Sequence, residues 1–268
     1  MNKVTWAVQT NLVADHTAEA VWNAAKALGC QTVEASVIPF SLEFGNESEY
    51  ENIPDDTVII PYGSVKLAKM ANERKWKGNC YDNERFDAIR WNAERDDMLN
   101  GDCIHLTIKE LNRYFRDCAD DKKWFIRPVK DLKAFNGTVA DTADIRDWMQ
   151  SPRSGSFEFG EDTQVIVAAV KHIYCESRWF IVDGKVIDGS LYRFGGRLMS
   201  EHLNDPEAYK HAQALADKWL PHPCCVMDVA DTEDGMKVIE FNTFNCAGFY
   251  DHRIDKIVTA MTEWAEKL

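Results

Sequence analysis

Residues 226–250, near the C-terminal end, constrain the fold most, because two apolar runs there flank the polar turn sequence DTEDG. Apolar runs on either side of a Gly-containing turn predict paired antiparallel strands. Alternation along the second strand places Glu240 and Asn242 on one face, and the first strand carries Asp228. Polar groups within apolar sequence are costly unless something binds them, and these three suit a hard cation such as Mg²⁺. The alternative is an ordinary hairpin whose carboxylates point into water.

Composition and charge limit the class of protein. Of the 268 residues, 45% are apolar and 11% aromatic, which is typical of a globular chain with one large or two to three small domains. The net charge of -13, from 44 acidic and 31 basic side chains, disfavours non-specific binding to nucleic acid or to an anionic membrane. We recognise no secretory leader and no membrane-spanning run, and therefore expect a cytoplasmic protein.

The cysteines are scattered along the chain and form no CxxC pair. In an intracellular chain, this spacing favours reduced thiols that pack as small apolar side chains, rather than disulfides or zinc ligands. The eight are Cys30, Cys80, Cys103, Cys118, Cys175, Cys224, Cys225 and Cys246.

Strand-like and helix-like segments alternate over the first 90 residues, which indicates a small parallel α/β domain. Apolar runs predict strands at residues 3–9, 31–40 and 55–65. Helical spacing predicts helices at residues 18–29 and 65–73. Tyr62, Gly63 and Ser64 follow the third strand, at the edge where such sheets bind ligands, although a plain strand-to-helix turn is the alternative.

A basic strand-turn-strand unit follows a connecting region. Residues 80–122 are polar and mostly helical in pattern, and we expect them to link two domains. In residues 122–139, Arg127 precedes a proline, and Lys130 and Lys133 lie in the turn. Fixed cations of this kind suit a polyphosphate, with solvated surface charge as the alternative reading.

A long β segment follows and carries two further arginines. The pattern predicts successive strands at residues 164–173, 177–184 and 185–194. The Asp183-Gly184 pair between the last two is a strong hairpin signal. Arg178 and Arg193 can then point toward one sheet surface. Helices are predicted at residues 204–220, capped by Asp205, and at 252–268, where the helix is expected to cover a sheet.

Three ordered blocks make the chain resemble the ATP-grasp superfamily, and within it the R-two-K clade. The blocks are FIRPVKDLKAFNG, ESRWFIVDGKVIDGSLYR and VIEFN. The resemblance spans essentially the whole chain. It implies an α/β (α+β) protein with a Rossmann-like pre-ATP-grasp domain at 1–95 and an ATP-grasp domain at 96–268, from a bacterium or a phage-infected host cell.

The resemblance also implies roles for individual residues. Asp228, Glu240 and Asn242 would hold Mg²⁺, and Arg178 and Arg193 would face the transferred phosphoryl group. The residues implied to bind ATP are Arg127, Lys130, Lys133, Ala169, Val170, Lys171 and, at the ribose, Glu176. Two features depart from the wider superfamily: position 127 holds Arg in place of Lys, and the segment expected to contact adenine lacks an acidic residue just before it.

The chemistry implied by this family is amide formation. A substrate carboxylate attacks the γ-phosphoryl group of ATP, and an amine then displaces phosphate from the acyl phosphate. Such an enzyme needs no nucleophilic side chain, and His172, His202 and His252 are assigned structural roles. The expected partners are small-molecule or peptide substrates. We expect substrate specificity to depend on the region around Gln9, Asn11 and Tyr62 and on the loop at 244–250. A kinase and a nucleotide-binding regulator without turnover remain open as alternatives.

Overall fold

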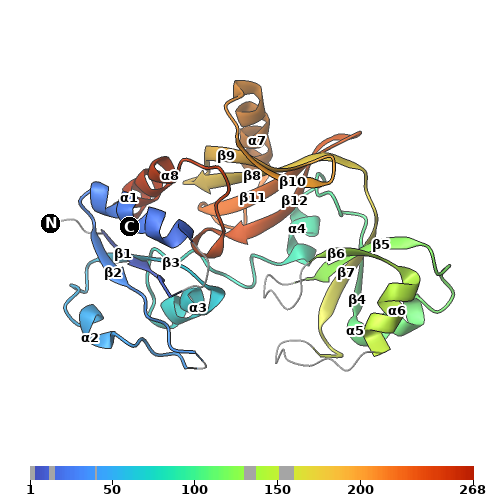
Figure 1. Cartoon of the computed structure of the whole chain (residues 1–268), viewed down its shortest axis with the longest axis horizontal. Coiled ribbons are helices and arrows are strands. Elements are labelled where there is room, and N and C mark those ends of the chain that lie inside the picture. Colours follow the sequence, from blue (N-terminus) through green and yellow to red (C-terminus); the bar gives the residue numbers. More distant parts are fainter. Residues whose placement is uncertain (1–3, 12–15, 40, 130–136, 151–159) are drawn as a thin grey trace.

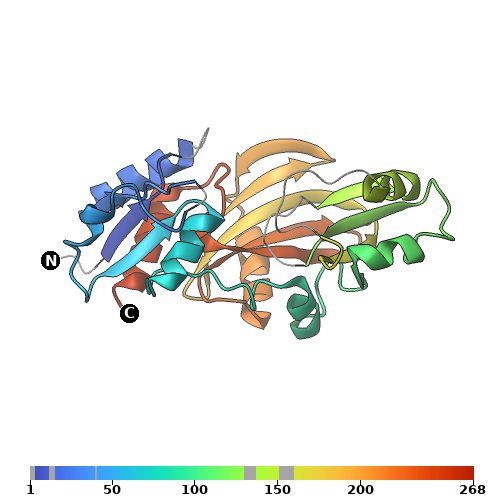
Figure 2. The same ribbon diagram turned by 90° about the horizontal axis from the view of Figure 1, so that it is seen from below.

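The computed structural model describes residues 4–11, 16–39, 41–129, 137–150 and 160–268, and places their strands in three sheets. In Figure 1 the three-stranded, five-stranded and four-stranded sheets lie from left to right, with the five-stranded sheet between the other two. Figure 2 shows the same order from below. Among the described helices, none combines the length and apolar character that a bilayer crossing requires.

The N-terminal sheet is parallel, with strand order β2-β1-β3, which confirms the predicted α/β unit. All five residues of β1 and of β3 are buried, as expected for a parallel sheet covered on both faces. Ser64 caps the helix after β3 by accepting a hydrogen bond from the Leu67 backbone N–H. The elements are β1 Val4–Val8, α1 His16–Ala27, β2 Gln31–Glu34, α2 Glu47–Tyr50, β3 Val58–Tyr62 and α3 Val65–Glu73.

The four-stranded sheet is antiparallel, in the order β4-β7-β5-β6. Its first strand corrects the prediction of mostly helical structure at 80–122: residues 104–107 are extended because they pair with β7. The Thr107 and Glu110 side chains form a capping box that starts the next helix. The elements are α4 Ala88–Glu94, β4 Ile104–Thr107, α5 Ile108–Tyr114, β5 Lys123–Pro128, β6 Thr138–Asp141, α6 Thr142–Gln150 and β7 Gln164–Ala169.

The five-stranded sheet is antiparallel, in the order β10-β9-β8-β11-β12. The prediction of one continuous strand at 164–173 is wrong, because β7 ends at Ala169 in the four-stranded sheet and β8 begins at Ile173 in the five-stranded sheet. The predicted hairpins are confirmed, and Asp183 and Gly184 both have positive φ, of 54° and 74°. The elements are β8 Ile173–Val182, β9 Lys185–Phe194, β10 Arg197–His202, α7 Pro206–Lys218, β11 Cys225–Thr232, β12 Gly235–Thr243, the 3-10 turn η1 Phe244–Cys246 and α8 Ile254–Ala265.

One apolar core joins the N-terminal sheet to the C-terminal part of the chain. It contains side chains of β1, β3 and α1 together with side chains of β8, β11 and α8. Within it, the indole Nε1 of Trp6 donates a hydrogen bond to Thr262 Oγ1 at 3.0 Å. Helix α8 therefore covers apolar surface inside the molecule, as predicted. The division at residue 95 stays a prediction, and Trp91, which precedes it, packs against Phe241 of β12.

Candidate active site

A row of charged side chains crosses the five-stranded sheet. Arg178 of β8, Asp228 of β11 and Glu240 of β12 are directly opposite one another in register. The Arg178 guanidinium donates to both oxygens of Asp228, from Nε to Oδ1 and from Nη2 to Oδ2, each at 2.8 Å. The hairpin signal at 226–250 thus places two of the predicted metal ligands side by side on one surface.

The four-stranded sheet contributes Arg127 to the same row. This residue lies near the end of β5, and its Nη1 donates to Glu240 Oε2 across the space between the two sheets. The guanidinium also lies over the Trp91 ring, 5.5 Å from the ring centroid. Arg127 is 8% exposed, so the contact between the sheets is a largely buried ion pair. The structure therefore brings residues 127 and 240 together from different sheets.

Asn242 connects the two carboxylates. Its amide nitrogen donates to Asp228 Oδ2 and to Glu240 Oε1, both at 3.3 Å. Asp228 is 2% exposed, while Glu240 and Asn242 are half-buried. A half-turn of the Asn242 amide would present its oxygen to the same point. The two carboxylates and the amide oxygen form the donor set that Mg²⁺ prefers, so these residues could hold that ion.

Burial and the neighbouring arginines shift the pKa values of the two carboxylates in this row. Burial raises the pKa of Asp228, and Arg178 opposes that rise only in part. Burial also acts to raise the pKa of Glu240, but the charges of Arg127 and Arg178 outweigh it and hold that pKa below its usual value. Glu240 is therefore the more strongly ionised carboxylate, and Asp228 the one more easily protonated.

Arg193 and Glu176 form a second ion pair beside the row. Arg193 Nε lies 3.2 Å from Glu176 Oε1, yet the nitrogen is buried and has no aligned hydrogen-bond acceptor among the described residues. A register shift in β9 makes Tyr192 an extra residue between the pairs Glu176–Arg193 and Ser177–Leu191. Burial, followed by the charges of Asp228 and Glu176, raises the pKa of Tyr192, so its phenol stays protonated.

Two tyrosines frame Arg178. The rings of Tyr192 and Tyr250 stack with centroids 5.0 Å apart, and the guanidinium lies 5.1 Å from the Tyr250 centroid. Arg178 also donates through Nη1 to the Gly248 carbonyl at 3.1 Å. The loop after η1 therefore reaches the charged row. Tyr62 of the N-terminal sheet donates to the Ala247 carbonyl of that loop at 3.1 Å.

His252 holds the same loop against β8. Its Nδ1 accepts from the Tyr250 backbone N–H at 3.1 Å, and its Nε2 lies 3.1 Å from the Arg178 carbonyl oxygen. The first bond requires Nδ1 to be unprotonated, so the Nε2–H donates to Arg178. Burial lowers the pKa of His252 to about 4, which keeps the ring neutral. This is the structural role assigned to it from the sequence.

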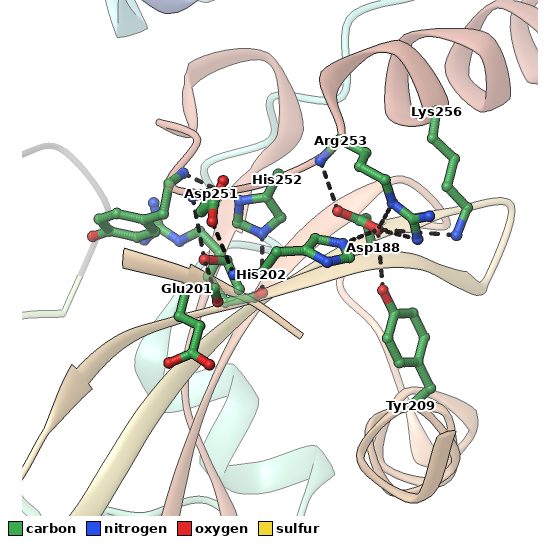
Figure 3. A network of polar contacts seen from close by, with 11 residues as sticks. Asp188, Glu201, His202, Tyr209, Asp251, His252, Arg253 and Lys256 are labelled. Carbon is green, nitrogen blue, oxygen red and sulfur yellow. Dashed lines mark hydrogen bonds and ion pairs between the residues drawn. The ribbon is translucent and has the colours of Figure 1, made fainter. Parts of the chain in front are cut away.

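A buried carboxylate, Asp188 of β9, anchors the chain that follows His252 (Figure 3). It accepts hydrogen bonds from the Arg253 backbone N–H at 2.8 Å and from Tyr209 Oη at 3.0 Å. Burial acts to raise its pKa, but the hydrogen bonds from Arg253, His202 and Tyr209 outweigh burial and lower it. Asp188 thereby joins β9, β10, α7 and the start of α8, and supports the loop that carries Tyr250.

The residues expected to contact adenine lie at the crossing between the two large sheets. Ala169 ends β7, and Val170 and Lys171 follow it before β8 begins. Lys171 forms an ion pair with Asp102, and both line a cavity of about 410 Å³ together with Val170. Asp228, Glu240 and Asn242 do not line that cavity. Lys130 and Lys133 lie outside the described residues.

A larger cavity, of about 670 Å³, lies on the opposite face of the five-stranded sheet. It lies against α7 and is lined by the alternate β8 residues Cys175, Ser177 and Trp179. No residue predicted for the ATP site lines it. The predicted residues that contact one another, Arg127, Arg178, Asp228, Glu240 and Asn242, lie on the other surface of the sheet, where β5 approaches.

Sequence reasoning missed the residues that support Arg178. Tyr192 and Tyr250 were given no individual role, and Asn245, directly after the predicted hairpin, was not singled out. The Asn245 side chain is 1% exposed and binds the Cys80 backbone N–H and the Pro61 carbonyl, each at 2.7 Å. The available signal was the polar Asn in FNCAGFY, which follows an apolar strand.

Solved structures with a similar fold are ATP-grasp proteins. The RimK domain protein ATP-grasp from Sphaerobacter thermophilus has a TM-score of 0.61 at 12% identity, covering 98% of this chain and 99% of its own. The ATP-grasp ligase PsnB, complexed with precursor peptide PsnA2 and AMPPNP, has a TM-score of 0.59 at 12% identity, with 99% of each chain covered. D-alanine–D-alanine ligase from Bacillus anthracis has a TM-score of 0.57 at 11% identity, covering 98% of this chain and 97% of its own.

No curated protein sequence matches this chain significantly. The profile described as ATP-grasp domain, R-two-K clade family 3, matches residues 65–261, which includes the strands that carry Arg127, Arg178, Asp228 and Glu240. With most of its length matched and an ATP-grasp fold over nearly all of it, the chain belongs to family 3 of the R-two-K clade of ATP-grasp domains.

Proposed function

We propose that this protein is an ATP- and Mg²⁺-dependent ligase that joins a carboxylate to an amine through an acyl phosphate and releases ADP and phosphate. The observation that supports this most directly is the charged row Arg178–Asp228–Glu240–Arg127, which runs from one sheet to the other. Membership of the ATP-grasp family supports the same reading, as do the ligases among the structures that share its fold.

The charge balance of the surface supports a magnesium–triphosphate ligand. Three guanidinium groups, of Arg127, Arg178 and Arg193, stand among three carboxylates, of Glu176, Asp228 and Glu240. In the present arrangement each arginine pairs with one carboxylate. An incoming triphosphate offers the arginines stronger anionic partners, and the freed carboxylate oxygens can then take up Mg²⁺.

In this proposal, the side chains act by position and charge. Bound Mg²⁺ supplies positive charge at the phosphate oxygens. Arg178 and Arg193 would stabilise the charge that develops as a substrate carboxylate oxygen attacks the γ-phosphorus and ADP leaves. The amine nitrogen then attacks the acyl carbon, the C–O bond to phosphate breaks, and the amide forms. We assign ATP contacts to Arg127, Lys130, Lys133, Ala169, Val170, Lys171 and Glu176.

The loop at 244–250 is proposed as part of the site for the small-molecule or peptide acceptor. It carries Tyr250 beside Arg178, and Tyr62 of the N-terminal sheet contacts it. The N-terminal strand end, where Gln9 accepts a hydrogen bond from Ser64 Oγ at 2.7 Å, lies next to the same contact. We therefore propose that substrate choice is made where the N-terminal sheet meets the surface proposed to bind ATP.

The test is the substitution Glu240→Gln, which keeps the size of the side chain and removes its charge. With ATP, Mg²⁺ and pooled amino acids, peptides and polyamines, we expect ADP release to fall by about 10²-fold or more, as when one electrostatic contact to a transition state is lost. The matched control is Glu263→Gln, at an exposed position of α8. That variant should keep wild-type turnover.

The products separate the alternatives. A ligase releases ADP and phosphate only when both carboxylate and amine are present. A stable phosphorylated product without free phosphate would indicate a kinase instead, and tight ATP binding without ADP release with any acceptor would indicate a regulator. Unchanged ATP binding and unchanged turnover in Glu240→Gln would show that the site is misplaced.

A further inference from the structure

Two cysteines and a histidine meet at the junction of the N-terminal sheet and the hairpin. One ligand atom from each of Cys80, His222 and Cys224 lies within 4.8 Å of the other two. Cys80 follows α3, and the other two residues lie directly before β11. More than 140 residues separate Cys80 from His222, which explains why no metal-binding motif was visible in the sequence.

The cluster combines soft ligands with burial. Cys80 is 1% exposed and Cys224 is fully buried, while His222 is half-buried. We propose that Cys80, Cys224 and His222 bind one thiophilic divalent metal ion of the Zn²⁺ class, at a site separate from the ATP surface. A tetrahedral zinc with about 2.3 Å bonds to sulfur places two sulfurs roughly 3.8 Å apart, so the observed spacing requires little movement.

Charge also favours a divalent ion at this position. Two thiolates and a neutral imidazole cancel the charge of Zn²⁺, and a neutral assembly costs less to bury than an isolated ion. Coordination would release the thiol protons to the buffer.

The groups around the cluster hold its ligands in place. His222 Nδ1 lies 3.0 Å from both the backbone nitrogen and the carbonyl oxygen of Cys224, and the Trp264 ring packs edge-on against the imidazole. The buried Asn245 side chain fixes the Cys80 backbone N–H at 2.7 Å. The imidazole ring and the backbone that carries the two thiols are therefore held in place before any ion arrives.

The neighbouring cysteine does not join the cluster. Cys225 begins β11 and packs into the core on the other face of the sheet, with Met227 and Phe241. Cys224 belongs to the core shared with the N-terminal strands. Water would take the fourth coordination position, as in zinc sites with three protein ligands.

The ion would tie two segments together at the base of the hairpin. Cys224 lies four residues before Asp228, immediately ahead of the strand that carries it, so the metal would fix that strand to the segment after α3. Its role would be to stabilise the junction. The proposed Mg²⁺ ligands would stay the same.

The experiment measures metal bound to the full-length protein. Purified under reducing conditions and dialysed against a weak chelator, the wild type should retain about one zinc per chain by elemental analysis. Replacement by Co²⁺ should give the intense thiolate-to-cobalt absorption of a tetrahedral site, and removal of the ion should lower Tm.

Variants assign the ligands. Cys224→Ser and His222→Ala should lose zinc and the cobalt absorption, and Cys118→Ser, at a half-buried thiol in a separate core, should keep both. If the ligand variants do not fold, the wild-type cobalt spectrum decides. Wild-type protein that holds no stoichiometric zinc and gives only the weak spectrum of octahedral cobalt would overturn the proposal, whatever the outcome for ATP turnover.

Discussion

At the scale of single residues, the site depends on charges that are held in pairs. Arg178 lies against Asp228, and Arg127 against Glu240, with little access to water. Burial opposes the charged form of Arg178, but Asp228 outweighs it and raises the pKa of the guanidinium. Removing one partner would leave the other as an uncompensated buried charge, which is strongly destabilising. Charge-neutral, size-matched substitutions must therefore be judged for folding as well as for activity.

His252 predicts a pH dependence of stability. Its pKa is about 4 in the folded protein, below the ordinary value near 6.5, through burial and in spite of its bond to the Arg178 carbonyl and of the nearby Asp188. Because the folded state binds the proton less well, the stabilising effect of neutral His252 is complete above pH 6.5 and is lost as pH falls toward 4. The full loss is up to about 3 kcal/mol.

The measurement is urea unfolding between pH 7 and 4.5, for wild type and for His252→Gln. The glutamine amide can donate to the Arg178 carbonyl but does not titrate, so the variant should lose less stability on acidification. His105→Gln, at an exposed histidine, is the control and should follow the wild type. Identical pH profiles for wild type and His252→Gln would rule out His252 as the source.

At the scale of elements, two β-bulges shape the surface that carries the charged row. In β12, Glu240 pairs with Asp228 while Val238 pairs with Val229, so Ile239 is the extra residue. In β9, Tyr192 is the extra residue. Bulges turn the strand locally and re-aim side chains, which explains why simple alternation from the sequence did not place Tyr192 beside Arg178.

A glycine in β9 lets a tryptophan pack flat against the strand. A Cβ atom on Gly189 would overlap ring carbons of Trp179, a fully buried side chain directly opposite it. We expect Gly189→Ala to lower the free energy of unfolding by about 1–3 kcal/mol, because the ring or the strand must shift. Gly160→Ala is the control, since no atom of the described residues lies within 4 Å of its added Cβ. Equal chemical-denaturation midpoints for the two variants would contradict this account.

At the scale of the whole molecule, Asn245 joins the N-terminal sheet to the hairpin that carries Asp228 and Glu240. Its side chain donates to the carbonyls of Pro61 and Gly78, at 2.7 and 3.2 Å, and accepts from the Cys80 backbone N–H. Its own carbonyl accepts from the backbone N–H of residue 63 at 2.9 Å. One buried residue after β12 thus ties down the end of β3 and the segment after α3.

Asn245→Ala should therefore loosen two distant segments together. We expect a loss of about 2–4 kcal/mol, because three buried backbone groups lose their partner. Hydrogen exchange should rise both near residues 61–80 and at the base of the hairpin. Asn52→Ala, which removes an exposed side chain whose amide donates to the Ser48 carbonyl at 3.3 Å, should change neither. Faster exchange confined to one segment would argue against the coupling.

The sequence by itself determined the local elements and the carboxylate side of the site. Local pattern encodes features that depend on neighbours a few residues away. These are the turn at Asp183-Gly184, the cap at Asp205, and the alternation that puts Glu240 and Asn242 on one face of their strand. Three features were decided only by the tertiary structure. They are the break between strands at 170–172, the pairing of Arg127 with Glu240, and the contact of Cys80 with His222 and Cys224. Each joins segments from different sheets or distant parts of the chain, so their contact depends on how the sheets pack, which no local spacing records.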